Sequence, residues 1–164
     1  MTAPQKRPFS RKKSLLERWS QVRRIKKRAM KGPSNFIFVK EFKPLIEEWM
    51  NEESISRNPL LNENVREMAR RGMKDADFAI KNKIHEWGLS RALNMTGIFS
   101  SRERRMIRTK MDFILTANKN QQMNALIGVR KELGLLQYKK FLAWYNHTVD
   151  FIQKRTELLY ESLK

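Results

Sequence analysis

The most regular pattern in this chain is LLQYKKFLAWYNHTVDFIQKRTELLYESL, residues 135–163. Apolar pairs recur in it seven residues apart, and two further apolar residues widen the stripe: Trp144 with Tyr145, Phe151 with Ile152, Leu158 with Leu159, then Phe141 and Val149. This spacing places the pairs along one side of a helix. The width of the stripe predicts one long helix that packs on more than one neighbour.

The segments before this helix carry recognisable helix boundaries. Ser100-Ser101-Arg102-Glu103 has the pattern of a capping box. In this motif the serine side chain accepts a hydrogen bond from the Glu103 amide, and the glutamate side chain reaches back to the start of the helix. A helix should follow to about Ala117, because apolar residues recur at helical spacing: Ile107, Met111, Ile114 and Leu115. Another helix is expected over residues 121–133, with Gly134 as its C-terminal cap.

Two more helices are predicted upstream, over residues 62–71 and 74–93, with Gly72 between them. The second should have a buried face made by Phe78, Ile84, Trp87, Leu89 and Leu93. Before them, Asn58-Pro59 marks a turn.

The apolar run over residues 36–39 fits either a strand or a helix, and Pro44 suits the first turn of a helix that continues to about Asn51. Strand-like alternation is scarce, and no proline lies beyond Pro59. The predicted fold class is therefore all-α, with a basic N-terminal helix-turn-helix arm followed by a four-helix-type bundle.

Charge divides the chain into an arm, residues 1–34, and a body, residues 35–164. The whole chain has 35 Lys and Arg against 17 Asp and Glu, a formal charge of +18. Residues 1–31 hold twelve of the basic residues and one acid, Glu17, so their net charge is +11. The segment ends at Gly32-Pro33-Ser34, a helix stop followed by a turn. A chain with this charge distribution is expected to bind a polyanion.

The arm should form a basic helix from about Ser10 to Lys31, with a thin apolar stripe and cations around most of its circumference. Each cation that neutralises a phosphate releases counterions, whatever the base sequence. Cations all around the helix favour a segment that is surrounded by phosphates over a helix that contacts base edges in one groove. Sequence-independent packaging of nucleic acid is therefore expected. A nuclear-localisation cluster over residues 24–28 remains an alternative interpretation.

A second basic stretch begins at the capped helix and contains Arg102, Arg104, Arg105, Arg108 and Lys110. It fits a solvated helix face or a second contact with nucleic acid. The acidic stretch over residues 41–53 fits a solvated face or a contact with the arm of a neighbouring copy.

The sequence contains no pattern that calls for catalysis, a cofactor or a metal. Cysteine is absent, and no Walker loop, dinucleotide fingerprint or nucleophile elbow is present. His85 and His147 are expected at a helix surface or interface. Asp75 and Asp77 are expected to be acids near the start of a helix, where the helix dipole favours negative charge. A site for a divalent cation is the less favoured interpretation of this pair. The acids at 63 and 67 are expected to pair with nearby arginines, and the protein is not expected to be an enzyme.

The opening segment Lys6-Arg7-Pro8-Phe9-Ser10-Arg11-Lys12, followed by Leu15, Trp19 and a basic helix, resembles the N-terminal arms of coat proteins from filamentous archaeal viruses. The layout of a basic arm before a helical bundle is similar too. In that family the arm wraps double-stranded DNA in the A-form, and the bundles pack as the outer wall of the virion. Some members of the family pair two paralogous coat proteins. The resemblance implies that this chain assembles in many copies, either alone or with such a partner.

The resemblance also implies roles for individual residues of the arm. Leu15 and Trp19 would anchor it against a neighbouring subunit. The phosphate contacts would be Arg7, Arg11, Lys12, Lys13, Arg18, Arg23, Arg24, Lys27 and Arg28.

Two other classes of protein account for the same charge. One is a helical accessory subunit of a ribonucleoprotein complex, in the cytoplasm or nucleus, and the other is a viral matrix-type protein whose basic arm meets anionic lipid. Assembly separates the three: a coat protein forms regular polymers with nucleic acid, an accessory subunit has a fixed stoichiometry, and a matrix protein binds lipid.

Overall fold

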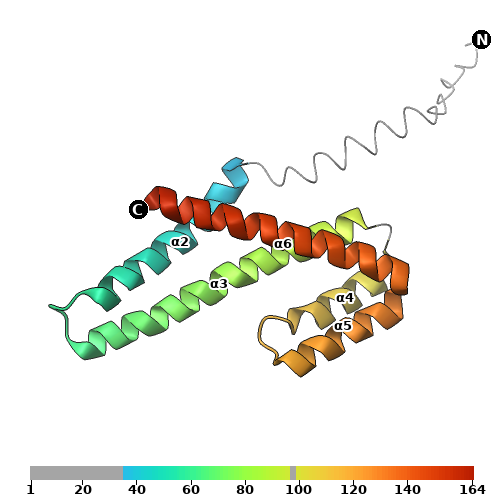
Figure 1. Ribbon diagram of the computed structural model, residues 1–164, viewed down its shortest axis with the longest axis horizontal. Coiled ribbons are helices and arrows are strands. Elements are labelled where there is room, and N and C mark those ends of the chain that lie inside the picture. Colours follow the sequence, from blue (N-terminus) through green and yellow to red (C-terminus); the bar gives the residue numbers. More distant parts are fainter. Residues whose placement is uncertain (1–34, 97–98) are drawn as a thin grey trace, which may run out of the picture. The chain divides into compact units, whose positions relative to one another are not determined.

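The computed structural model describes residues 35–96 and 99–164, all within one unit of the chain, Gly32–Lys164. These residues form five helices: α2 (Asn35–Arg57), α3 (Glu63–Met95), α4 (Ser101–Asp112), α5 (Lys119–Leu133) and α6 (Leu135–Leu163) (Figure 1). Because the described part contains no strand, the predicted all-α class is confirmed for it. The helix-turn-helix arm lies outside the described residues. In the described part, no helix is long and apolar enough to cross a membrane.

Helix α2 begins at Asn35, so the expectation of a helix that starts near Pro44 was wrong. The apolar run over residues 36–39 is helical, and Pro44 lies inside the helix. An internal proline costs about 3 kcal/mol. Phe38, Phe42 and Ile46 recur every four residues and are at most 2% exposed, and burial of each contributes about 1.5–3 kcal/mol. Their burial offsets the cost of the proline.

Helix α3 runs without interruption through Gly72, so the prediction of two separate helices was wrong. A Cβ atom on Gly72 would lie 2.8 Å from Cδ of Glu52 on α2. That Cδ atom belongs to the flexible end of the Glu52 side chain. Helices α2 and α3 lie side by side (Figure 1). A single glycine costs a helix only about 1 kcal/mol relative to alanine, too little to end a packed helix. The predicted turn at Asn58-Pro59 is confirmed, with Asn58 Oδ1 accepting from the Leu60 amide at 3.0 Å.

The predicted cap of α4 is confirmed in its main contact. Ser100 Oγ accepts from the Glu103 amide at 3.1 Å, and the Glu103 carboxylate reaches back to the Ser100 hydroxyl at 2.9 Å. The helix ends at Asp112 rather than near residue 117, and turns follow. There Gln122 Nε2 donates to the Ile114 carbonyl at 2.6 Å, which gives that carbonyl a partner outside a helix.

The boundaries of α5 and α6 agree closely with the pattern of the sequence. Helix α5 begins at Lys119, two residues before the predicted start, because Asn118 and Gln121 form a capping box. Gly134 ends it with a φ of 78°, a conformation that glycine adopts without strain. Helix α6 has the predicted bounds and contacts α2, α3 and α5, so its packing on several neighbours is confirmed.

The body contains two apolar cores, and α6 runs through both. One joins the C-terminal part of α3, α4, α5 and the first half of α6, with Leu89, Leu93, Ile107, Met111, Val129 and Phe141 at its centre. The other joins α2, α3 and the second half of α6 around Phe42 and Ile152. A four-helix arrangement therefore describes one end of the body, and three helices form the other. Phe78 was predicted to be buried but is 48% exposed.

Candidate functional site

Helix α4 carries a dense run of cations, five within residues 102–110. Helix α4 packs Ile107 and Met111, both fully buried, into the first core. That contact fixes the rotation of the helix and turns its opposite side toward solvent. The side chains exposed there include Arg102, Arg104, Arg105 and Arg108, whereas Lys110 is half-buried. The nine phosphate contacts predicted from Arg7 to Arg28 lie outside the described residues, so they stay predictions.

The positive charge of the body is concentrated around this helix. Residues 101–140 hold ten Lys and Arg against three acids, a net charge of +7. Residues 32–164 together also have a net charge of +7, from 23 basic and 16 acidic residues. The rest of the body is therefore electrically balanced.

Ion pairs also distinguish α4 from the helices before it. On α3, the expected pairs are confirmed: Glu63 binds Arg66 at 2.6 Å and also Arg70, and Glu67 binds Arg70 at 3.1 Å. On α4, by contrast, no Lys or Arg forms an ion pair with another described residue.

A polar cluster of the buried His85 and Tyr145 with the exposed Asp112 lies where α3, α4 and α6 meet. His85 was expected at a helix surface or interface, and it lies at such an interface, 2% exposed. Its Nδ1 lies 2.7 Å from the Tyr145 hydroxyl, and its Nε2 lies 3.2 Å from Asp112 Oδ1. One tautomer satisfies both contacts: Tyr145 donates to Nδ1, and Nε2–H donates to Asp112. Burial raises the pKa of Tyr145 to about 12. His147 is exposed, as expected.

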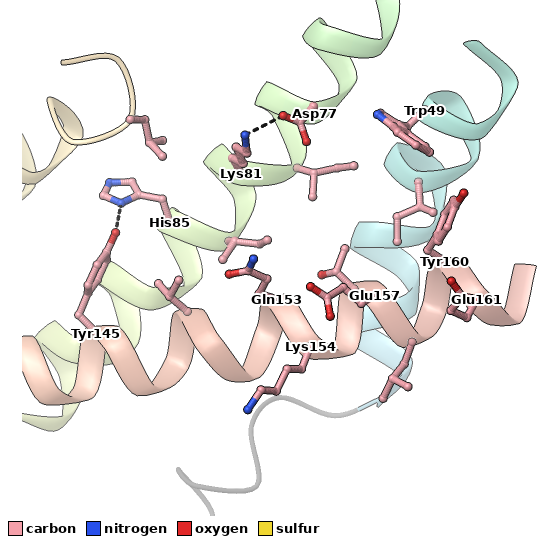
Figure 2. Close-up of a pocket in the computed structure, with 17 residues that line it drawn as sticks. Trp49, Asp77, Lys81, His85, Tyr145, Gln153, Lys154, Glu157, Tyr160 and Glu161 are labelled. Carbon is pink, nitrogen blue, oxygen red and sulfur yellow. Dashed lines mark hydrogen bonds and ion pairs between the residues drawn. The ribbon is translucent and has the colours of Figure 1, made fainter. Parts of the chain in front are cut away.

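A pocket of about 930 Å³ borders this cluster and is lined mainly by α2, α3 and α6. Figure 2 shows His85 and Tyr145 toward one end and Trp49 and Tyr160 toward the other. Both ring nitrogens of His85 have hydrogen-bonding partners within the protein. The pocket walls combine apolar side chains with polar and charged ones of both signs, and they indicate no particular ligand.

The acids at 75 and 77 lie in the middle of α3, so their explanation by a helix dipole was wrong. Asp77 forms an ion pair with Lys81 at 2.8 Å, and Asp75 is exposed. Within residues 35–96 and 99–164, no group of three or more His, Asp or Glu is placed to hold a metal ion.

The sequence indicated the cations of α4, but it gave no indication of the contact between His85, Asp112 and Tyr145. These residues are separated by 27 and 60 positions along the chain. Only the packing of three helices brings them together.

No protein-family model, curated protein or solved structure matches this chain.

Proposed function

We propose that this protein packages nucleic acid, as a coat protein that binds duplex DNA through its phosphates and assembles in many copies. The observation that carries the proposal is the net charge of +11 within residues 1–31. Duplex DNA carries one negative charge for about every 1.7 Å of its axis, and neutralising it releases counterions. A dense cationic segment gains affinity from this release without any contact to a base.

The body supports assembly in many copies because it exposes large apolar side chains on several helices and in the turn between α2 and α3. Leu60 is 92% exposed, Phe36 77%, Met68 71% and Leu158 70%. Contact between neighbouring copies on the nucleic acid would bury such side chains and favour a continuous coat. The resemblance of the arm implies that this assembly is the filament of an archaeal virus. In some members of that family, the filament also contains a paralogous coat protein.

Electron microscopy and binding titrations of the full-length protein with DNA test the proposal together. Mixtures with unrelated duplexes of equal length should all give regular filaments, with affinities that fall steeply as salt increases. A preference of about 1000-fold or more for one duplex would contradict sequence-independent binding. Complexes of fixed stoichiometry would favour an accessory subunit, and binding to phosphatidylserine vesicles without binding to DNA would favour a matrix-type protein.

The arm itself is tested by replacing Arg23, Arg24, Lys27 and Arg28 with glutamine. If all four contact phosphates, the slope of log affinity against log salt concentration should become shallower by about 3.6. An unchanged slope would refute the assignment of these residues.

A further inference from the structure

Three arginines of α4 form a row on its solvent-facing side. Arg102, Arg105 and Arg108 follow one another at intervals of three residues, and all three are exposed. Residues three apart on a helix have Cβ atoms about 5–6 Å apart. Three positive side chains are therefore held as neighbours by one packed, regular helix.

The fold itself disfavours this arrangement. Like charges at this spacing destabilise a helix by about 0.2–0.5 kcal/mol per pair. Arg102 and Arg104 also lie in the first turn of α4, where the helix dipole favours anions. Residues that oppose the stability of their own helix are expected where a function requires them.

The two acids of α4 are engaged in other contacts. Glu103 accepts a hydrogen bond from the Ser100 hydroxyl at the helix cap, and Asp112 contacts the buried His85. The arginines therefore remain without a carboxylate partner among the described residues, and an external anion can bind them without first displacing one.

More cations lie at the same end of the body. Helices α4 and α5 pack as an antiparallel pair, and α6 begins directly after α5 (Figure 1). The end of α5 and the start of α6 therefore lie near the start of α4. The exposed cations of these segments are Arg130, Lys131, Lys139 and Lys140.

We propose that the exposed row Arg102, Arg105 and Arg108 is a second binding surface for the phosphodiester backbone of nucleic acid. This inference rests on the proposed packaging function and extends it from the arm to the body. A helix that binds a membrane surface inserts its apolar face into the lipid. Two of the three apolar residues of α4, Ile107 and Met111, are instead fully buried in the protein, and the third, Met106, is partly buried against the same core. The side chains that α4 exposes are polar or charged, which suits phosphates in solution.

The test compares two variants of the full-length protein that lose the same charge. One replaces Arg102, Arg105 and Arg108 with glutamine. The control replaces three cations on α3 and α6 with glutamine: Arg71, Lys74 and Lys154, all exposed. Circular dichroism melts of both variants verify that they fold, and a titration with one duplex at several salt concentrations gives the slope for each.

Loss of three phosphate contacts should make the slope for the α4 variant shallower by about 2.7, while the control keeps the slope of the unmodified protein. Between 50 and 200 mM salt, the unmodified protein should then lose about 40-fold more affinity than the α4 variant. Equal slopes for the two variants would overturn the inference. It would also be overturned if the α4 variant bound the duplex like the unmodified protein and lost only its binding to phosphatidylserine vesicles. If the unmodified protein does not bind the duplex, the proposed function itself fails.

Discussion

Replacing Tyr145 with phenylalanine removes one hydroxyl group from the polar cluster and leaves the rest of the side chain in place. The hydroxyl lies 2.7 Å from Nδ1 of His85, which is 2% exposed. A buried acceptor left without a donor costs about 1–3 kcal/mol. In a chain of this length, each kcal/mol corresponds to about 2–4 °C in Tm. Tyr145→Phe should therefore lower the Tm by about 2–12 °C.

A double-mutant cycle separates the hydrogen bond from general packing. His85→Leu leaves the Tyr145 hydroxyl unpaired in turn, whereas the double variant removes both polar groups together. Because an apolar pair leaves nothing unsatisfied, the double variant should be more stable than the sum of the single losses implies, by about 1–2 kcal/mol. Urea unfolding followed by circular dichroism measures all four proteins. Additive losses, within about 0.5 kcal/mol, would refute the bond between His85 and Tyr145.

The same variant gives a pH test, because burial raises the pKa of Tyr145 from 10.0 to about 12. The folded protein favours the protonated phenol, so this stabilisation is fully present below pH 10 and is lost as the pH rises toward 12. The difference corresponds to about 3 kcal/mol. Phenylalanine does not titrate, so the stability gap between the unmodified protein and Tyr145→Phe should narrow between pH 10 and 12. A constant gap would contradict this explanation.

Two further predictions concern packing and assembly. Gly88→Ala should lower the Tm, because its Cβ would lie 2.8 Å from a valine methyl group of α6, and overpacking costs about 1–3 kcal/mol. In the matched control, Gly128→Ala, the closest contact of the new Cβ is the flexible end of Lys110, so the Tm should stay the same or rise. Equal changes in the Tm of the two variants would contradict this explanation. Ile107→Ala should lower the free energy of unfolding by about 2–5 kcal/mol in urea titrations, whereas Leu158→Ala should change it by about 0.5 kcal/mol or less and weaken assembly on DNA in light scattering. Normal assembly by Leu158→Ala would remove that residue from the proposed interface.

The sequence predicted helix positions best where a cap or a long periodic stripe determines them. Gly134 and the stripe of residues 135–163 gave the bounds of α6, and Ser100 gave the start of α4. Local preference failed at Pro44 and Gly72, because tertiary packing outweighs the penalty of one unfavourable residue. The predicted burial of Phe78 was wrong for a different reason. Apolar spacing identifies a helix face, but it does not show whether a neighbouring helix covers each position on that face.

The candidate site was only partly predictable for the same reason. A cluster of arginines is visible in the sequence, yet its exposure depends on which side of α4 is buried. Ile107 and Met111 determine that side, and their burial follows from the packing of four helices. Likewise, nothing local to Asp112 indicates that it contacts a histidine on α3 rather than the arginine one turn before it.

Asp112 connects the stability of the body to the charge of its surface. Its carboxylate lies one helical turn after Arg108, where it could form an ion pair along α4 worth about 0.3–0.5 kcal/mol. It contacts His85 Nε2 at 3.2 Å instead, with its own side chain 68% exposed. In this structure the carboxylate of Asp112 therefore lies against α3 and forms no ion pair with Arg108. An acid paired with Arg108 would compete with a phosphate, so this contact between α3 and α4 bears on the proposed surface: it leaves Arg108 without a carboxylate partner on its own helix.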